Sequence, residues 1–217
     1  TDVAFNKDGV IKSLKIRALD DAGAYPGRGP HQLAKPISAI VGPYKINSVD
    51  YEAISVTTNK TGQVPVRGFG QAPTNFMIET AVDKVARHLG MDRVEIRRRN
   101  LINHDEFPYQ IPSGTKYDSG DYHAVLDKVI DKAKYDELVK RRDTARKNGK
   151  WAGIGVTTCL EPSGGNNIFD VLDKAGISRT CHHDRPFANP GGTFDLDAGA
   201  GGGLPPGAVD TNPAFIH

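Results

Sequence analysis

An amphipathic stretch at residues 73–90 constrains the fold more than any other part of the sequence. Pro73 stands where a first helical turn tolerates proline, and Gly90 is typical of a helix end. Between them, apolar residues recur at the three- and four-residue spacing that places side chains on one helical face: Met77 or Ile78, Ala81, Val82, Val85 and Leu89. The sequence therefore predicts a long helix here.

Strand patterns precede this helix. Apolar residues on either side of the turn Asn6-Lys7-Asp8-Gly9 predict a β-hairpin that leads into a glycine- and proline-rich loop by residue 26. Residues 33–41 have weakly helical spacing, but Pro36 limits them to a short helix or turn. The β-branched residues of 46–59 alternate with charged ones and predict a strand.

Further helices follow the long one. Asp92 and Glu95 have the form of a capping box at the start of a second helix. A third helix starts near Asp121, and residues 135–147 continue helically with dense charge. Residues 153–161 predict a buried strand. Strands and helices are interleaved, so we expect an α+β (mixed α/β) fold with a hairpin, strands and three to four helices.

The character of the sequence changes near residue 176. Residues 1–175 carry the periodic patterns and form one partial domain, whereas residues 176–217 are rich in Gly, Pro, Ala and Asp and show neither period. We expect this tail to be disordered and foreign to the fold. The chain also begins without Met, inside a hairpin pattern, which suggests a fragment of a longer protein.

Composition excludes several classes of function. The chain has 28 basic and 26 acidic residues and a formal charge of +2, so no strong field for nucleic acid or membranes follows. No apolar run approaches the ~20 residues of a membrane span, and no signal peptide is evident. Cys159 and Cys181 form no CxxC motif, so neither a disulfide framework nor a zinc site is indicated. A cytoplasmic location fits best.

The segment VPVRGFG at residues 64–70 is the main candidate site. Gly68 and Gly70 predict either a plain tight turn or a close approach of backbone to a ligand. Backbone N–H groups near a helix start can donate to anionic oxygens, Arg67 adds a cation, and Phe69 can pack on an apolar ligand. The third glycine of a dinucleotide fingerprint and the GK[ST] of a P-loop are missing, which disfavours both sites.

Other polar groups are weaker candidates. Arg97, Arg98 and Arg99 are consecutive and would project from different sides of a helix. Their presence is therefore better explained by solvation and ion pairing than by nucleic-acid binding. His182-His183-Asp184 has no further ligand spacing and predicts no metal site. Cys159 is interpreted as a small buried strand residue, since no neighbour activates it as a nucleophile. Glu161 ends that strand, either in a pocket or in solvent.

Several motifs in register resemble the molybdenum-binding large subunit of the xanthine dehydrogenase and aldehyde oxidase family, including its carbon monoxide dehydrogenase-like bacterial branch. The resemblance covers roughly residues 1–175. It rests on GAY at 23–25, RGFG at 67–70, MDRVEIRRRNLI at 91–102, FPYQIPSGTKYDSGDY at 107–122 and GIGV at 153–156.

The resemblance implies a molybdenum–molybdopterin cofactor, in the cytosine dinucleotide form, held by Val66, Arg67, Gly68, Phe69 and Gly70. Phe69 would also line the substrate channel. The family hydroxylates carbon with oxygen derived from water and passes electrons through iron–sulfur clusters to a flavin. We therefore expect a 2Fe-2S small subunit and an FAD medium subunit as partners, and an aldehyde, N-heterocycle or aromatic compound as substrate, with no nucleic acid.

The sequence also departs from the family. Val66 stands where an aromatic residue is frequent, and Pro73 lies one position later than the family's proline, so the substrate pocket differs from that of purine-oxidising members. The loop has no copper-binding cysteine, which disfavours carbon monoxide oxidation. Residues 162–217 match neither the family's glutamate base nor its glutamine-containing loop, so we assign no catalytic residue and no protein metal ligand. The alternative is a catalytically silent homologue or gene remnant that acts as an interaction piece.

Overall fold

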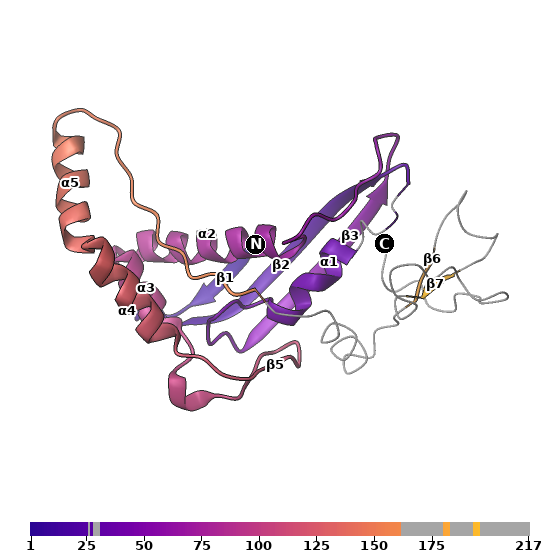
Figure 1. Cartoon of the computed structure of the whole chain (residues 1–217), viewed down its shortest axis with the longest axis horizontal. Helices are drawn as coiled ribbons and strands as arrows, with labels where there is room; N and C mark the ends of the chain where they lie inside the picture. The colour runs from indigo at the N-terminus through magenta and orange to yellow at the C-terminus, as the bar shows by residue number, and fades with distance from the viewer. Residues whose placement is uncertain (26, 28–30, 162–179, 183–192, 196–217) are drawn as a thin grey trace.

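The computed structural model describes residues 1–25, 27, 31–161, 180–182 and 193–195. A three-stranded sheet lies beside a long helix, and two further helices extend away from them (Figure 1). Strands and helices are interleaved along the chain, which confirms the mixed α/β fold expected from the sequence.

The sheet has the strand order β1-β2-β3. Strands β1 (Asp2–Phe5) and β2 (Ile11–Gly23) are antiparallel, which confirms the predicted hairpin. Strand β3 (Ser48–Thr57) confirms the second strand prediction, but it pairs with β2 in parallel, from Ser13↔Ser48 to Gly23↔Thr57. A parallel pair requires a crossover connection, which the chain supplies between β2 and β3.

Two short helical turns occupy that crossover: α1 (His31–Ala34) and the 3-10 helix η1 (Lys35–Ala39). They confirm the short helix predicted around Pro36, which lies in the first turn of η1. Both lie between β3 and the start of the long helix (Figure 1). The side chains of the crossover therefore lie near the 64–70 segment.

The long helix α2 (Gln71–Leu89) starts two residues before the predicted position and ends at Gly90, whose φ of +64° is left-handed. Its apolar face packs into a core of residues from β2, the crossover and the next helix. The core includes Ile11, Leu14, Ile16, Ile40, Tyr44, Ile46, Ile78, Val82, Val85, Ile96, Leu101 and Ile102.

Helices α3 and α4 begin where the sequence predicted. Asp92 accepts hydrogen bonds from the N–H groups of Val94 and Glu95 at the start of α3 (Arg93–Asn100), and Asp121 accepts one from Ala124 at the start of α4. Lys134, in a left-handed conformation, separates two helices where we expected continuity. They are α4 (Tyr122–Ala133) and α5 (Tyr135–Lys147), preceded by η2 (His104–Glu106), β4 (Tyr109–Gln110) and β5 (Lys116–Tyr117).

The prediction of a buried strand at residues 153–161 is wrong. The segment is extended and its burial alternates, but it pairs with no strand that the structure describes. It lies instead along helices: Ile154 O accepts from Arg93, and Leu160 O accepts from Gln71. Because only alternate residues face inward, Cys159 is exposed and not buried as predicted.

Beyond residue 161 the structure describes one antiparallel pair, β6 (Thr180–His182) with β7 (Thr193–Asp195). These six residues form strands in the tail for which no element was expected. The rest of the predicted 176–217 tail lies outside the described residues, as do His183 and Asp184.

Arg97 forms the ion pairs expected for the arginines of α3, but it is buried and not solvated as expected. Its side chain is 0% exposed and donates to Glu79 Oε2 at 2.9 and 2.7 Å and to Asp83 Oδ1 at 2.9 Å. Tyr44 and Thr158 donate to the same Glu79 carboxylate. This buried cluster joins α2, α3, the crossover and the extended segment, and so fixes α2 from several sides.

Candidate cofactor-binding site

The predicted site residues 66–70 form a compact turn that leads directly into α2. The Phe69 N–H donates to Val66 O and the Ala72 N–H donates to Gly68 O, both at 2.9 Å. Thr74 donates to Gly70 O through its N–H at 3.2 Å and its hydroxyl at 2.7 Å. The turn is thus tied to the first turn of a 19-residue helix, which makes it a rigid platform.

The two glycines serve different purposes. Gly70 has φ +71°, and a Cβ there would overlap Gln32 O and lie 3.0 Å from Pro36 Cδ, so internal packing requires glycine. Gly68 has φ +93°, yet its nearest atom beyond its neighbours would be Ala72 Cβ at 4.0 Å. Only Gly68 therefore leaves its side of the turn open to another molecule.

The other three residues of the turn present different chemistry. Val66 is 77% exposed, and Arg67 is exposed and forms no hydrogen bond or ion pair with a described residue. Phe69 is half-buried, with Lys35 Nζ 4.9 Å from the centre of its ring. The structure thus brings together a free guanidinium, an apolar side chain and an aromatic ring within five residues.

The turn also offers unused hydrogen-bonding groups. The N–H groups of Gly68 and Gly70 have no acceptor among the described residues. Gln71, the first residue of α2, is fully buried and donates to Leu160 O at 3.1 Å, but its Oε1 has no partner in the described part of the chain. Free donors and one orphaned acceptor beside an open glycine fit a ligand such as a pterin, which carries both oxygens and N–H groups.

Gln71 was missed by the sequence analysis. Its importance comes from complete burial with one unsatisfied oxygen, which no local pattern reveals, because its partner Leu160 is 89 residues away. The one signal in the sequence was its place directly after the second glycine, at the first position of the helix.

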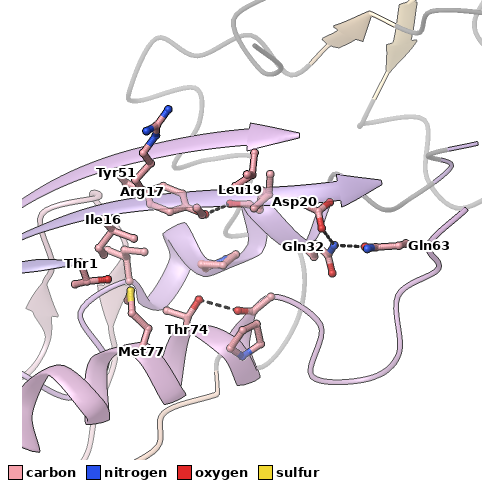
Figure 2. A pocket seen from close by; sticks show the side chains of 16 residues that line it. Thr1, Ile16, Arg17, Leu19, Asp20, Gln32, Tyr51, Gln63, Thr74 and Met77 are labelled. Atoms are coloured by element: carbon pink, nitrogen blue, oxygen red, sulfur yellow. Dashed lines mark hydrogen bonds between the residues drawn. The ribbon is translucent and has the colours of Figure 1, made fainter. Parts of the chain in front are cut away.

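A cavity of about 410 Å³ lies between β2, α1 and α2, with Gly70 in its wall (Figure 2). Gln32 Nε2 donates to Asp20 Oδ1 at 2.5 Å and to Gln63 Oε1 at 2.6 Å, and so joins the strand, the crossover and the segment before the turn. The other oxygen of Asp20 is buried without a described partner. These hydrogen bonds hold the segment before the turn against β2 and the crossover.

A second cavity of about 550 Å³ lies on the other side of the chain. It is formed by α4, α5 and residues 154–160, and its lining is largely apolar. Val125 and Val129 of α4 are exposed at its mouth. None of the turn residues 66–70 lines it, so it is separate from the candidate site.

The weaker candidates form ion pairs within the chain. Each of the three consecutive arginines of α3 pairs with a carboxylate: Arg97 with Glu79, Arg98 with Asp127 and Arg99 with Glu95. Glu161 pairs with Lys35 at 2.9 Å. Among the described residues, no cluster of three or more His, Cys, Asp or Glu side chains could hold a metal ion. In the same part of the chain, no helix has the length and apolar character needed to cross a bilayer.

Comparison with known proteins identifies a family for the part of the chain that contains the turn. The family described as the molybdopterin cofactor-binding domain matches residues 1–101, which include the whole turn. The nicotine 6-hydroxylase large subunit of Paenarthrobacter nicotinovorans is 33% identical over 74% of this chain and 20% of its own length. The carbon monoxide dehydrogenase large chain of Hydrogenophaga pseudoflava is 34% identical over 83% of this chain and 23% of its own.

Comparison with solved structures finds a similar fold. Quinoline 2-oxidoreductase from Pseudomonas putida 86 superposes with a TM-score of 0.62 at 30% identity, over 68% of this chain and 19% of the other. The family match and the fold together define a protein of the molybdopterin-binding class.

The chain belongs to the molybdenum-binding large subunits of the xanthine dehydrogenase and aldehyde oxidase family of molybdopterin oxidoreductases, as the sequence motifs indicated. It spans about a fifth of the length of the relatives it matches.

Proposed function

We propose that this chain works within a longer large subunit of a molybdenum hydroxylase. That enzyme oxidises an aldehyde, N-heterocycle or aromatic substrate with oxygen from water. The observation that carries the proposal is the open turn at Gly68, with its free N–H group, ahead of a rigid helix in a chain of this family.

Each turn residue has a role in the proposal. The backbone at Gly68 and Gly70 donates hydrogen bonds to the cofactor, Arg67 supplies a positive charge for its anionic oxygens, and Val66 covers it with an apolar side chain. Gln71 Oε1 accepts from an N–H of the bound group. The cofactor, molybdenum–molybdopterin in its cytosine dinucleotide form, supplies the hydroxylation chemistry when bound.

Phe69 forms the boundary between cofactor and substrate in this proposal. Its ring is half-buried, so part of it packs on the crossover while the rest is available to a substrate. Relatives named as acting on nicotine and quinoline favour an N-heterocycle over a simple aldehyde. The turn has no cysteine that could hold copper, so similarity to carbon monoxide dehydrogenases does not extend to their substrate.

Partner subunits complete the enzyme in this proposal. A small subunit with 2Fe-2S clusters and a medium subunit with FAD carry electrons away from molybdenum, since the described residues contain no cluster of metal-ligating side chains of their own. A relative named as the gamma subunit of a dehydrogenase complex supports such an assembly. We place the complex in the cytoplasm.

The test uses the full-length large subunit that carries this chain, coexpressed with its partners in a host that makes the cofactor. We expect near-equimolar molybdenum, and hydroxylation of quinoline that incorporates oxygen-18 from labelled water. The 217-residue chain alone should hold substoichiometric molybdenum, because one turn cannot replace the several loops around a pterin. Molybdenum without hydroxylation of any tested aldehyde, heterocycle or aromatic would favour the silent homologue.

A matched pair of variants tests the turn itself. Gly68→Val should lower molybdenum content, because a branched side chain closes the open side of the turn. Gly149→Val is the control, since Gly149 also has positive φ (+71°) and open space around it but follows α5. If both variants lose molybdenum equally, backbone strain explains the loss and the turn has no special role.

A further inference from the structure

Lys35 links the candidate site to the end of the extended segment. Its Nζ atom lies 4.9 Å from the centre of the Phe69 ring, over its face, and 2.9 Å from Glu161 Oε1. The Lys35 side chain is only 17% exposed. The ammonium therefore has two partners and little access to water, and one of the partners is the residue assigned to the substrate channel.

The parts of this contact are anchored independently. Gly70, next to Phe69, packs directly on the backbone of Gln32 and on Pro36, so the turn cannot move away from the crossover that carries Lys35. Leu160, next to Glu161, accepts hydrogen bonds from two side chains of α2, at 3.1 and 3.4 Å. The ring, the ammonium and the carboxylate thus come from three elements that are fixed to one another.

A surface ion pair alone does not explain this arrangement. Glu161 is 50% exposed, and ion pairs with an exposed partner contribute little to stability. A cation over an aromatic face gains strength as water is excluded, and it also favours one orientation of the ring. The contact is therefore better suited to fixing the Phe69 ring than to stabilising the chain.

We propose that Lys35 is a positioning residue that holds the Phe69 ring in one orientation and so makes the site selective for planar aromatic substrates. Glu161 keeps the ammonium over the ring. This inference rests on the proposed function, in which Phe69 lines the substrate channel. A planar substrate needs a fixed ring to stack on, whereas a small aliphatic aldehyde does not.

The first test compares two substrates in the complete enzyme. Lys35→Met should lower kcat/KM for quinoline about three- to tenfold, the range that loss of a partly desolvated cation–π contact allows. The value for acetaldehyde should change less than twofold, and molybdenum content should stay the same. Lys35→Arg should restore the preference, because a guanidinium also stacks on an aromatic face.

The control is Lys45→Met, which removes another half-buried lysine paired with a glutamate, Glu106 at 3.3 Å, away from the turn. It should leave the ratio of the two substrates unchanged. Equal losses for quinoline and acetaldehyde in Lys35→Met, or the same shift in ratio in Lys45→Met, would overturn the selectivity role.

The second test needs no turnover. A fluorinated phenylalanine placed at position 69 of the same complex should give one sharp fluorine NMR signal that shifts and broadens in Lys35→Met but not in Lys35→Arg. An unchanged signal in Lys35→Met would refute the positioning role. If the complex hydroxylates nothing, the proposed function fails, yet this spectrum still decides whether Lys35 fixes the ring.

Discussion

The buried cluster around Arg97 makes the sharpest prediction of stability. Arg97→Met keeps most of the side chain's length and removes its charge. The wild-type guanidinium is 0% exposed and donates to Glu79, to Asp83 and to the backbone of Arg93. Although burial opposes the charged form, Tyr44, Glu79 and Asp83 outweigh it and raise the pKa of Arg97.

The magnitude follows from what the substitution leaves behind. The side chain of Glu79 is 6% exposed and would keep only Tyr44 and Thr158 as donors, so a buried carboxylate would lose its counter-charge. Leaving one member of a buried ion pair unpaired costs about 3–5 kcal/mol. This is a large share of the ~5–15 kcal/mol that stabilises a typical domain.

Urea unfolding followed by far-ultraviolet circular dichroism measures this loss. Fluorescence would report poorly, because Trp151 is fully exposed. Arg98→Met is the matched control: it is the next residue, and its pair with Asp127 is 42% and 57% exposed, so its loss should cost ~1 kcal/mol or less. Equal costs for the two substitutions would refute the view that the Arg97 cluster holds α2 and the extended segment together.

Three further predictions concern the turn and the core. Gly70→Ala should destabilise the chain more than Gly149→Ala by urea unfolding: both positions have positive φ, but only Gly70 meets the Gln32 backbone. Phe69→Ala in the complete enzyme should lower kcat/KM by a factor that corresponds to ~1–3 kcal/mol of transition-state stabilisation, with molybdenum retained. If the substitution instead costs ~3–5 kcal/mol of stability without substrate dependence, Phe69 is a core residue. Burial raises the pKa of Tyr51 from 10.0 to about 12, so the native state holds this proton longer and its stabilising contribution, complete below pH 10, is lost as pH rises toward about 12. Because Tyr44, Tyr117 and Tyr135 also have raised pKa values, ultraviolet titration of tyrosinate should show one late-ionising tyrosine fewer in Tyr51→Phe than in wild type.

The elements that the sequence predicted correctly depend on neighbouring residues. The α2 helix has its apolar face and terminal glycine within 20 residues, and the caps at Asp92 and Asp121 bind N–H groups two or three positions away. The segment at 153–161 has a strand pattern because neighbouring residues alternate between apolar and polar side chains. Its alternation is real, but whether a partner strand adjoins it depends on residues far away in the chain.

The site was predictable only in part. The turn at 66–70 was predictable because its glycines mark it. That packing against Gln32 and Pro36 requires Gly70, whereas Gly68 faces open space, is evident only from the structure. Lys35 and its partner Glu161 are 126 residues apart. A sequence taken alone carries no sign of such long-range contacts. From the sequence, Glu161 was therefore predicted at a strand end, and no role was predicted for Lys35.

We propose above that the turn at 66–70 faces the molybdenum cofactor. Anomalous diffraction at the molybdenum absorption edge, from crystals of the full-length large subunit with its partners, locates the metal directly. We expect the molybdenum peak on the open side of Gly68, within reach of Arg67 and Phe69. A peak elsewhere, for example beside the apolar cavity between α4 and α5, would contradict it.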